Sequence, residues 1–268
     1  MVGIVERLVP DELWELFQRV VPEAPSRPQG GGRRWHGDRE VLAAIVFVVT
    51  SGCTWQQLPS ASFGPSGATA HRRFSEWSKA RVWGKLHRLV LDELGARGEL
   101  DWSRCAIGSV NMRALKGDLT GPNPVDRGKY GSKIHLITER TGLPISVAIS
   151  GANVHDSQAL IPLVTGIPPI RSRRGLRRRR PGKLHADKGY DYRHLRQWLS
   201  GRGIRHRIAR KGVETSQRLG RHRWTIERTM SWLAGCRRLH RRYERKADHF
   251  LAFTSIACTL SCYRRLAK

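Results

Sequence analysis

Two acidic residues stand in sequence contexts that could place a carboxylate in a binding crevice. The first, Asp187, directly follows the short β-prone run Lys183 to Ala186 and precedes Gly189, where the backbone can turn sharply. A carboxylate at the end of a strand in a mixed sheet faces the crevice in which ligands bind. A lone aspartate at such a position is more often a turn or cap residue, so Asp187 by itself does not define a site.

Glu227, the second candidate, lies on a segment with helical periodicity. Ile226, Met230 and Leu233 form one apolar stripe, and Glu227 lies at its edge, from which a helix can point a carboxylate into a crevice. Arg223 lies four residues earlier on the same face, in the order that stabilises a helix less well. Taken alone, an exposed ion pair remains the alternative interpretation of these two residues.

The elements that must position both acids are predicted within residues 99–268. Short β-branched runs separated by turn residues predict strands, and Thr141-Gly142 predicts a hairpin between the second and third. The predicted strands are 105–112, 133–138, 143–150, 183–186 and 204–209. The predicted helices are 155–164, with Asp156 as its cap, 192–199, 221–239 and 248–264. This order predicts the α/β class, with a mixed sheet flanked by helices.

Residues 1–98 predict a separate helical domain that ends in the stretch from Gly95 to Gly98. Apolar spacing predicts helices near 8–20, 41–49 and 69–94, a helical turn at 55–58 and a loop at 60–67. A short helix, a turn and a basic amphipathic helix are what a helix-turn-helix DNA-binding domain requires. Arg72 and Arg73, on the polar side of the last helix, are candidate DNA contacts, although plain packing explains such helices equally well.

The chain is strongly basic. Its 268 residues include 49 Lys and Arg against 22 Asp and Glu, a formal charge of +27, and 39% are hydrophobic, which suffices for a packed core. So large an excess repels itself in the compact state and is best tolerated beside a polyanion, most commonly nucleic acid. A basic ribosomal or membrane-surface protein would share this charge, which therefore selects no function.

Neither export nor membrane insertion is predicted. No basic segment followed by an apolar run begins the chain, and the longest purely apolar run, Val41 to Val49, is too short to cross a bilayer. The five cysteines form no CxxC pair, which predicts reduced and mostly buried thiols in a cytosolic protein and makes zinc a poor candidate.

Two basic runs are candidates for holding DNA phosphates. Residues 171–183 contain seven arginines and one lysine, and residues 237–246 form the second run. Each neutralised phosphate adds salt-dependent affinity, although the first run is in structural terms a solvated, mobile loop. The candidates are Arg177, Arg178, Arg179, Arg180, Arg237 and Arg238. Trp198, Trp224 and Trp232 are expected in the core rather than as stacking platforms for bases.

Together, the strings around the two acids resemble the signatures of bacterial insertion-sequence transposases of the IS-five-like family. The two strings are HADKGYD at 185–191 and RWTIERT at 223–229. Further similar strings spread over nearly the whole chain: WQQLP at 55–59, DWS at 101–103, RALKG at 113–117, GSKIHL at 131–136 and CYRRL at 262–266. The resemblance implies an RNase H-like catalytic domain with a DDE triad that holds divalent metal.

The resemblance also implies roles for particular residues. Asp187 matches the second acid of the triad and Glu227 the third, so both are candidate catalytic and metal-binding residues. Arg223 matches the arginine of the family's Y-R-E-K signature, which contacts DNA near the cut. Transposition hydrolyses a phosphodiester and then joins the freed 3′-hydroxyl to target DNA, for which two Mg²⁺ (or Mn²⁺) ions about 4 Å apart are suited.

Three positions depart from the family pattern. The tyrosine of the signature falls at Gly220 and its lysine at Ala234, where Arg237 or Arg238 would stand in. The first acid should end the strand that begins at Cys105, and there the sequence has Gly108. Because no predicted turn requires this glycine, a lost carboxylate is the simpler account, and a glycine supplies no metal ligand. Asp118, in the following loop, is the acid that could swing in.

The function implied is that of a DNA transposase, impaired by Gly108. It would bind double-stranded DNA, both the terminal inverted repeats and the target, as a homodimer, and lie in the bacterial cytoplasm with the nucleoid. The alternatives are a transposase-derived DNA-binding protein that has lost catalysis, and a basic RNA-binding structural protein. The last explains the charge but not the placement of Asp187 and Glu227.

Overall fold

The helices of the N-terminal part pack around the apolar α3. The computed structural model describes residues 3–23, 36–213 and 216–268, and of residues 216–223 only the helical backbone. The first elements are α1 (Ile4–Leu8), α2 (Asp11–Gln18), α3 (Asp38–Ser51), η1 (Trp55–Gln57), α4 (Ser60–Phe63), α5 (Gly67–Lys79) and α6 (Val82–Arg97). Side-chain caps begin two of them, since Thr54 caps η1 and Ser66 caps α5.

Two expectations for this part are wrong. Residues 60–63 form the short α4 where a loop was predicted, and the predicted helix 69–94 is two helices. The break lies at Arg81, whose φ of 55° is left-handed and ends the helical path. The buried Trp83 indole donates to the Ser78 hydroxyl at 3.1 Å and so ties the two helix ends together. Apolar periodicity continues across such a break, which hides it in the sequence.

The second part contains the predicted mixed sheet. Its strands are β1 (Cys105–Arg113), β2 (Gly121–Pro122), β3 (Tyr130–Glu139), β4 (Pro144–Gly151), β7 (Lys183–Ala186) and β8 (Arg205–Ile208). β3 pairs antiparallel with β1, β4 and β2, whereas β7 pairs parallel with both β1 and β8. The predicted hairpin turn is confirmed, with Gly142 at a φ of 97°. The fold is therefore of the expected α/β class, a helical N-terminal region followed by a mixed sheet.

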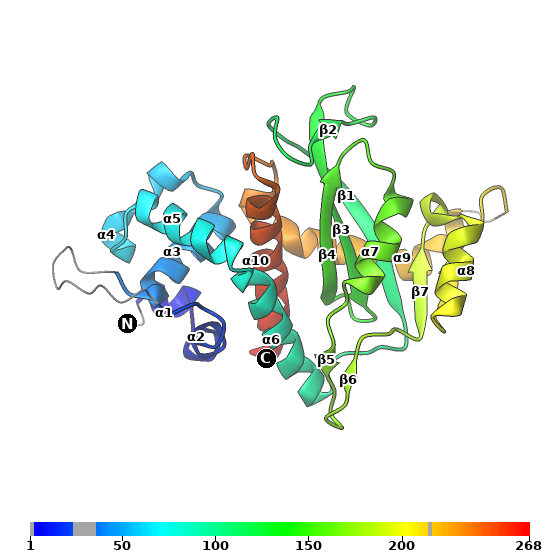
Figure 1. Cartoon of the computed structure of the whole chain (residues 1–268), viewed down its shortest axis with the longest axis horizontal. Coiled ribbons are helices and arrows are strands. Elements are labelled where there is room, and N and C mark those ends of the chain that lie inside the picture. Colours follow the sequence, from blue (N-terminus) through cyan, green and yellow to red (C-terminus); the bar gives the residue numbers. More distant parts are fainter. Residues whose placement is uncertain (1–2, 24–35, 214–215) are drawn as a thin grey trace.

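Helices flank this sheet (Figure 1). They are η2 (Asp156–Ala159), α7 (Leu160–Thr165), η3 (Lys188–Tyr190), α8 (Arg193–Gly201), α9 (Ser216–Ala234), η4 (Arg237–Leu239) and α10 (Ala247–Leu266). The predicted helix 221–239 thus ends at Ala234, just before Gly235. Residues 171–183, expected as a loop, contain the two-stranded hairpin of β5 (Ile170–Arg171) and β6 (Arg177–Arg178).

Helix α10 joins the two parts of the molecule. It packs along α6 and also contacts α3, α5 and β4, so it lies between the N-terminal helices and the sheet (Figure 1). His87 of α6 bonds the Pro144 carbonyl at 2.9 Å, and Arg97 donates to the Leu266 carbonyl at the same distance. Gly98 caps α6 with a φ of 78°. The division at 98/99 stays a prediction, since α6 shares its core with the second part.

The structure also bears on the expected state of the cysteines and on membrane insertion. All five cysteines are free thiols, and four of them are buried, as the absence of a CxxC pair predicted. Among the helices in the described part of the chain, none combines the length and apolar character needed to cross a membrane.

Candidate active site

A cavity of about 930 Å³ opens where two neighbouring strands separate. β1 and β7 are paired only at Cys105 with Leu184 and at Ala106 with His185, so beyond Ala106 the strands diverge. Gly108, Asp187 and Glu227 all line the cavity in this fork, together with Asp156. The structure therefore brings both sequence-predicted acids and the first-acid position around one space, at the carboxyl end of β7 where ligand crevices form.

Asp187 enters the cavity from the turn that follows β7. Its side chain is half-buried, and its Oδ1 accepts a 2.7 Å hydrogen bond from the Gly189 amide. Asp187 thereby caps the short helix η3. The capping role that the sequence also allowed is therefore real. It occupies one carboxylate oxygen, while the residue still lines the cavity.

Glu227 reaches the same cavity from helix α9. This helix packs on β1 and β3, with Ile226 buried against the sheet and Glu227 exposed beside it. The apolar stripe predicted from periodicity is thus the face that holds α9 in place. Because Ile226 and Glu227 are adjacent, the packing of one sets the position of the other.

Gly108 lies where α9 approaches β1 most closely. A Cβ built at Gly108 would lie 2.8 Å from Cγ1 of Ile226 and 3.3 Å from its Cγ2. Real Cβ contacts are essentially never this short, so the glycine permits a helix-to-strand contact that a side chain would prevent. No positive φ or turn requires this glycine, but its position is one of close approach, as a glycine inside a strand often indicates.

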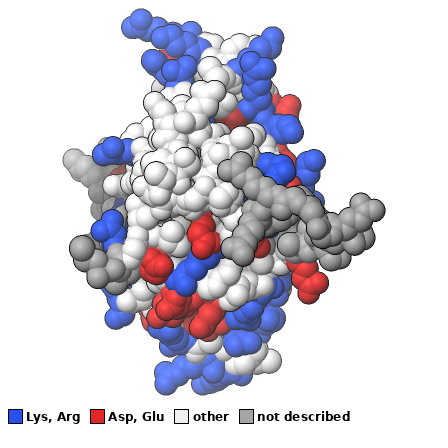
Figure 2. All heavy atoms as spheres, turned by 90° about the vertical axis from the view of Figure 1, so that its left-hand side faces the viewer, with Lys and Arg blue, Asp and Glu red and all other residues white. Residues whose placement is uncertain are grey.

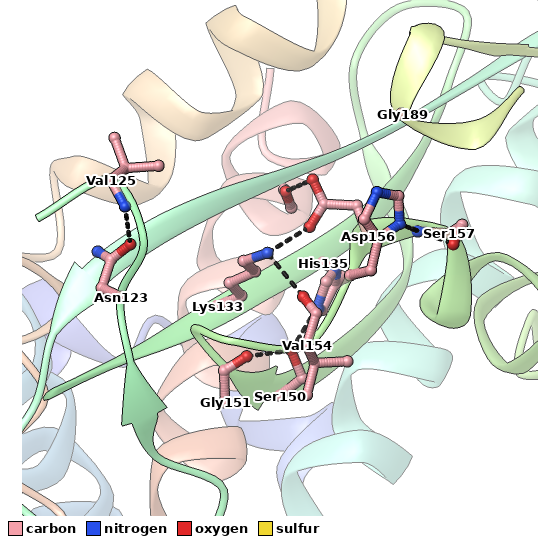
Figure 3. A network of polar contacts seen from close by, with 12 residues as sticks. Asn123, Val125, Lys133, His135, Ser150, Gly151, Val154, Asp156, Ser157 and Gly189 are labelled. Carbon is pink, nitrogen blue, oxygen red and sulfur yellow. Dashed lines mark hydrogen bonds and ion pairs between the residues drawn. The ribbon is translucent and has the colours of Figure 1, made fainter. Parts of the chain in front are cut away.

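Asp156 does not cap a helix, contrary to the sequence-based expectation. His155 occupies the cap position of η2 and accepts from the Ser157 amide. Asp156 instead accepts a 2.8 Å hydrogen bond from Lys133 Nζ and a 2.9 Å bond from Ser109 Oγ, as Figure 3 shows for the lysine. Burial opposes its ionisation, but these two hydrogen bonds outweigh that effect and hold the pKa of Asp156 below its usual value.

The sequence contained a weak signal for this network. Lys133 lies on β3, whose other residues are almost all buried, and its side chain is only 9% exposed. A lysine buried to this degree needs a carboxylate or carbonyl partner, and Lys133 has both, Asp156 and the Val154 carbonyl at 2.7 Å. The partner's identity depends on the turn after β4, which no local pattern reveals.

The donor set fits a magnesium ion bound largely by water and phosphate. Among the described residues, no three His, Cys, Asp or Glu side chains gather closely enough to hold a metal. Mg²⁺ is commonly held by one or two carboxylates together with substrate phosphates, because it gives up its waters reluctantly. Asp187 and Glu227 supply two such carboxylates on one cavity.

Basic side chains also line the cavity and give its rim a positive character. They come from the loop before β1, from β7, β8 and α8, and from the segment after β8: Arg104, Lys183, Arg196, Arg207 and Arg210. Arg196 is engaged with Asp191 at 2.7 Å. Carboxylates within a basic rim suit an anionic substrate whose reacting group also needs a cation.

The structure separates the predicted DNA-binding arginines into buried and exposed sets. Arg73 is 5% exposed and paired with Asp38 at 2.6 Å, while Arg238 is 7% exposed and paired with Glu244. Each guanidinium is thus buried in an ion pair within the protein, so neither Arg73 nor Arg238 presents its charge at the surface for DNA.

The other candidates lie at the surface or outside the described side chains. Arg72 and Arg237 are exposed, as are Arg178, Arg179 and Arg180. Arg177 is also exposed, but its guanidinium bonds both oxygens of the buried Asp92 at 3.1 Å and thereby anchors the β5–β6 hairpin. The side chain of Arg223 lies outside the described part.

One predicted core tryptophan is at the surface. Trp224 is 46% exposed, and the Arg228 guanidinium stacks on its ring at 4.3 Å and on Trp232 at 4.8 Å. The expected core position is therefore wrong for Trp224. Trp224 lies on α9, the helix that also carries Glu227, and it precedes Arg228 by one helical turn.

Comparison with known proteins agrees with this geometry. Residues 112–262 match the profile of the transposase DDE domain, and residues 9–87 match that of a putative transposase of the IS4/5 family. The chain is 45% identical over 159 residues to a putative transposase for insertion sequence element IS402 of Burkholderia cepacia, covering 59% of this chain and 75% of that protein. The chain therefore belongs to the DDE transposases of insertion sequences.

Two further similarities are weaker. An uncharacterized 16.2 kDa protein of insertion element IS402, also from Burkholderia cepacia, is 37% identical over 119 residues, which is 44% of this chain and 81% of that protein. Among solved structures, the Mos1 strand transfer complex aligns with 89% of this chain and 81% of its own, at 9% identity and a TM-score of 0.26. A score this low adds nothing to the assignment.

Proposed function

We propose that this chain binds the ends of its insertion sequence and catalyses metal-dependent strand cleavage and transfer, at a rate limited by Gly108. One observation carries the proposal: Asp187 and Glu227, which lie far apart in the sequence, line one cavity in the fork beside position 108. Mg²⁺ or Mn²⁺ bound there would activate the attacking oxygen and neutralise charge on the phosphate.

The chain's own residues have three tasks in this scheme. Asp187 and Glu227 provide hard oxygen ligands, held by the Gly189 amide and by the packing of α9. The basic rim positions the DNA backbone over the cavity. The turn after β7 fixes Asp187 by a hydrogen bond rather than by burial, so the carboxylate remains accessible to a ligand.

The face formed by the N-terminal helices is not a continuous basic surface. Figure 2 shows this side of the molecule with an uncharged central area, Lys and Arg gathered mainly toward the two ends, and acidic residues below the centre. Sequence-selective binding of terminal repeats by residues 1–98 would therefore use a limited part of this face, or exposed basic side chains elsewhere on these helices, such as Arg72 on α5.

The test is cleavage of a duplex that carries the element's terminal repeat. Asp187→Asn and Glu227→Gln should each reduce Mg²⁺-dependent or Mn²⁺-dependent cleavage by about a thousandfold or to background, since each loses an anionic ligand. Asp126→Asn, at a carboxylate paired with Arg113 outside the cavity, is the matched control. Cleavage that survives both substitutions would refute the assignment of the site.

The second candidate is a DNA-binding protein without catalysis, and Gly108 is the observation that favours it. A first acid would normally contact both ions, and glycine offers no side-chain ligand. End-specific binding with no cleavage under any divalent ion, unchanged by Asp187→Asn, would select this alternative. Preference for structured RNA over duplex DNA would exclude both.

A further inference from the structure

One wall of the cavity contains a carboxylate that the assigned triad does not use. Asp156 lines the cavity together with Ser109 and Gly108, and its side chain is 29% exposed. Both of its oxygens accept hydrogen bonds, Oδ1 from Lys133 Nζ, as Figure 3 shows, and Oδ2 from Ser109 Oγ.

The strand register places Asp156 on the sheet face opposite to α9. Gly108 faces Ile226 of α9, and side chains alternate along a strand, so Ser109 projects to the other face. Asp156 lies on that face too, because its Oδ2 accepts the hydrogen bond from Ser109 Oγ. In the fork beyond Ala106, where β1 has no β7 partner, the cavity is lined from both faces. Asp156 and Glu227 therefore approach it from opposite sides of the sheet.

A buried hydroxyl follows Asp187 in the chain and has no hydrogen-bond partner among the described residues. It belongs to Tyr190, whose side chain is fully buried. Burial, and then the charges of Asp156 and Asp187, raise the pKa of this phenol. Buried polar groups are almost always hydrogen-bonded, so this hydroxyl calls for an ordered water.

We propose that Asp156, held by Lys133 and Ser109, is a positioning carboxylate that supplies negative charge for divalent cation binding on the β1 wall, where residue 108 supplies none. It acts on a hydrated cation from across the cavity, because among the described residues it does not cluster with two other acids. Lys133 keeps Asp156 in place and at the same time opposes the cation, since its ammonium lies 2.8 Å from the carboxylate.

This proposal rests on the proposed function, but cation binding separates the two. Binding of Mn²⁺ to the full chain without DNA would be measured by titration calorimetry and by the electron paramagnetic resonance of free Mn²⁺. Asp156→Asn keeps the shape and should weaken binding by about fivefold or more, as expected for the loss of one unit charge near a divalent ion. Dependence on Asp156 without any DNA cleavage would support this inference and refute the proposed function.

A second variant guards against a purely structural effect. Lys133→Met has similar volume and removes the competing charge, so it should strengthen Mn²⁺ binding by a few fold even if the fold is destabilised. A pair that only holds the turn after β4 would weaken binding in both variants. Asp126→Asn is the matched control, because Asp126 also pairs with a cation and is 28% exposed. Equal weakening in Asp126→Asn, or unchanged binding in Asp156→Asn, would overturn the proposal.

Discussion

Gly108 and Ile226 share one contact, and that contact decides how the missing acid could be restored. An aspartate at position 108 would place its Cβ 2.8 Å from Ile226 Cγ1, close to the branch point of a side chain that is 6% exposed. Either the Ile226 side chain or α9 must therefore shift, and Glu227 is the next residue on that helix. Regaining the first carboxylate therefore disturbs the third.

We expect Gly108→Asp alone to raise DNA cleavage only weakly, and Gly108→Asp with Ile226→Ala to raise it by on the order of a thousandfold. Alanine removes both Cγ atoms that the new Cβ would meet. The cost is a cavity that lowers the free energy of unfolding by about 2–4 kcal/mol, which urea unfolding would record.

The matched control for this prediction is Gly108→Asn with Ile226→Ala, which has the same shape without the charge. A similar gain in that variant would attribute the effect to packing rather than to a metal ligand. A full gain from Gly108→Asp alone would show that α9 yields readily, despite its close approach to β1 at Ile226.

At the residue scale, the sequence identified the acids whose neighbours formed a specific string and missed those held by distant partners. Asp187 and Glu227 each stand in a distinctive string, and the structure places both on one cavity. Asp156 was assigned to a cap because a helical segment follows it, whereas its partners Ser109 and Lys133 lie 47 and 23 residues away. The register of β1 and β3 brings Ser109 and Lys133 onto one face, and the turn after β4 brings Asp156 to them.

At the scale of elements, strands were predicted more accurately than helix ends. Strand β7 and the β3–β4 hairpin follow from β-branched runs and turn residues, and the structure contains both. The break between α5 and α6 lies at the left-handed Arg81 and is bridged by the bond of Trp83 with Ser78, while α9 ends at Ala234, just before Gly235. Apolar periodicity alone specifies none of them.

The contact between α6 and β4 predicts a loss of stability in mild acid. His87 is 6% exposed and its ring bonds the Pro144 carbonyl, while burial lowers its pKa from 6.5 to about 4. Between pH 6.5 and about pH 4, His87 is protonated in the unfolded chain and neutral in the folded chain. The stability that a neutral His87 contributes is therefore complete above pH 6.5 and is lost as the pH falls toward 4.

For this histidine the free energy of unfolding should fall by about 2 kcal/mol from pH 7 to pH 5. Urea unfolding of the wild type and of His87→Gln at both pH values measures this difference. Between pH 7 and pH 5, the free energy of unfolding of His87→Gln should fall by about 2 kcal/mol less than that of the wild type, because glutamine does not titrate. Equal falls in the two proteins would contradict the assignment. Burial also lowers the pKa of His135 to about 4, so His135 should add a similar fall in the wild type and in the His87→Gln variant.

At the scale of the molecule, α10 makes the two predicted domains interdependent. It is buried along most of its length and packs on α6, so removal of residues 1–98 would expose one of its faces. A truncated chain would therefore test stability as much as DNA recognition. Point substitutions at exposed arginines are the cleaner probes of DNA binding.

The net charge of +27 predicts salt-sensitive DNA binding, and the β5–β6 hairpin offers the sharpest test. Arg177 is neutralised by Asp92 and anchors the hairpin. Beyond it, Arg178 stacks on Trp102, while Arg179 and Arg180 bond the carbonyls of Thr165 and Arg202. These partners are neutral, so within the described part of the chain these contacts leave three surface charges uncompensated.

We therefore expect non-specific duplex affinity to fall with salt at a log–log slope of about −5 or steeper. Replacing Arg178, Arg179 and Arg180 with serine should reduce the steepness by about 2 to 3, close to one for each phosphate that is no longer neutralised. Fluorescence anisotropy over a series of salt concentrations measures both slopes. The control replaces Arg7, Arg88 and Arg127, which are exposed and distant in sequence, and changes the net charge by the same amount. If both triple variants changed the slope equally, the total charge rather than the hairpin would determine binding; a nearly flat slope in the wild type would refute the electrostatic mechanism itself.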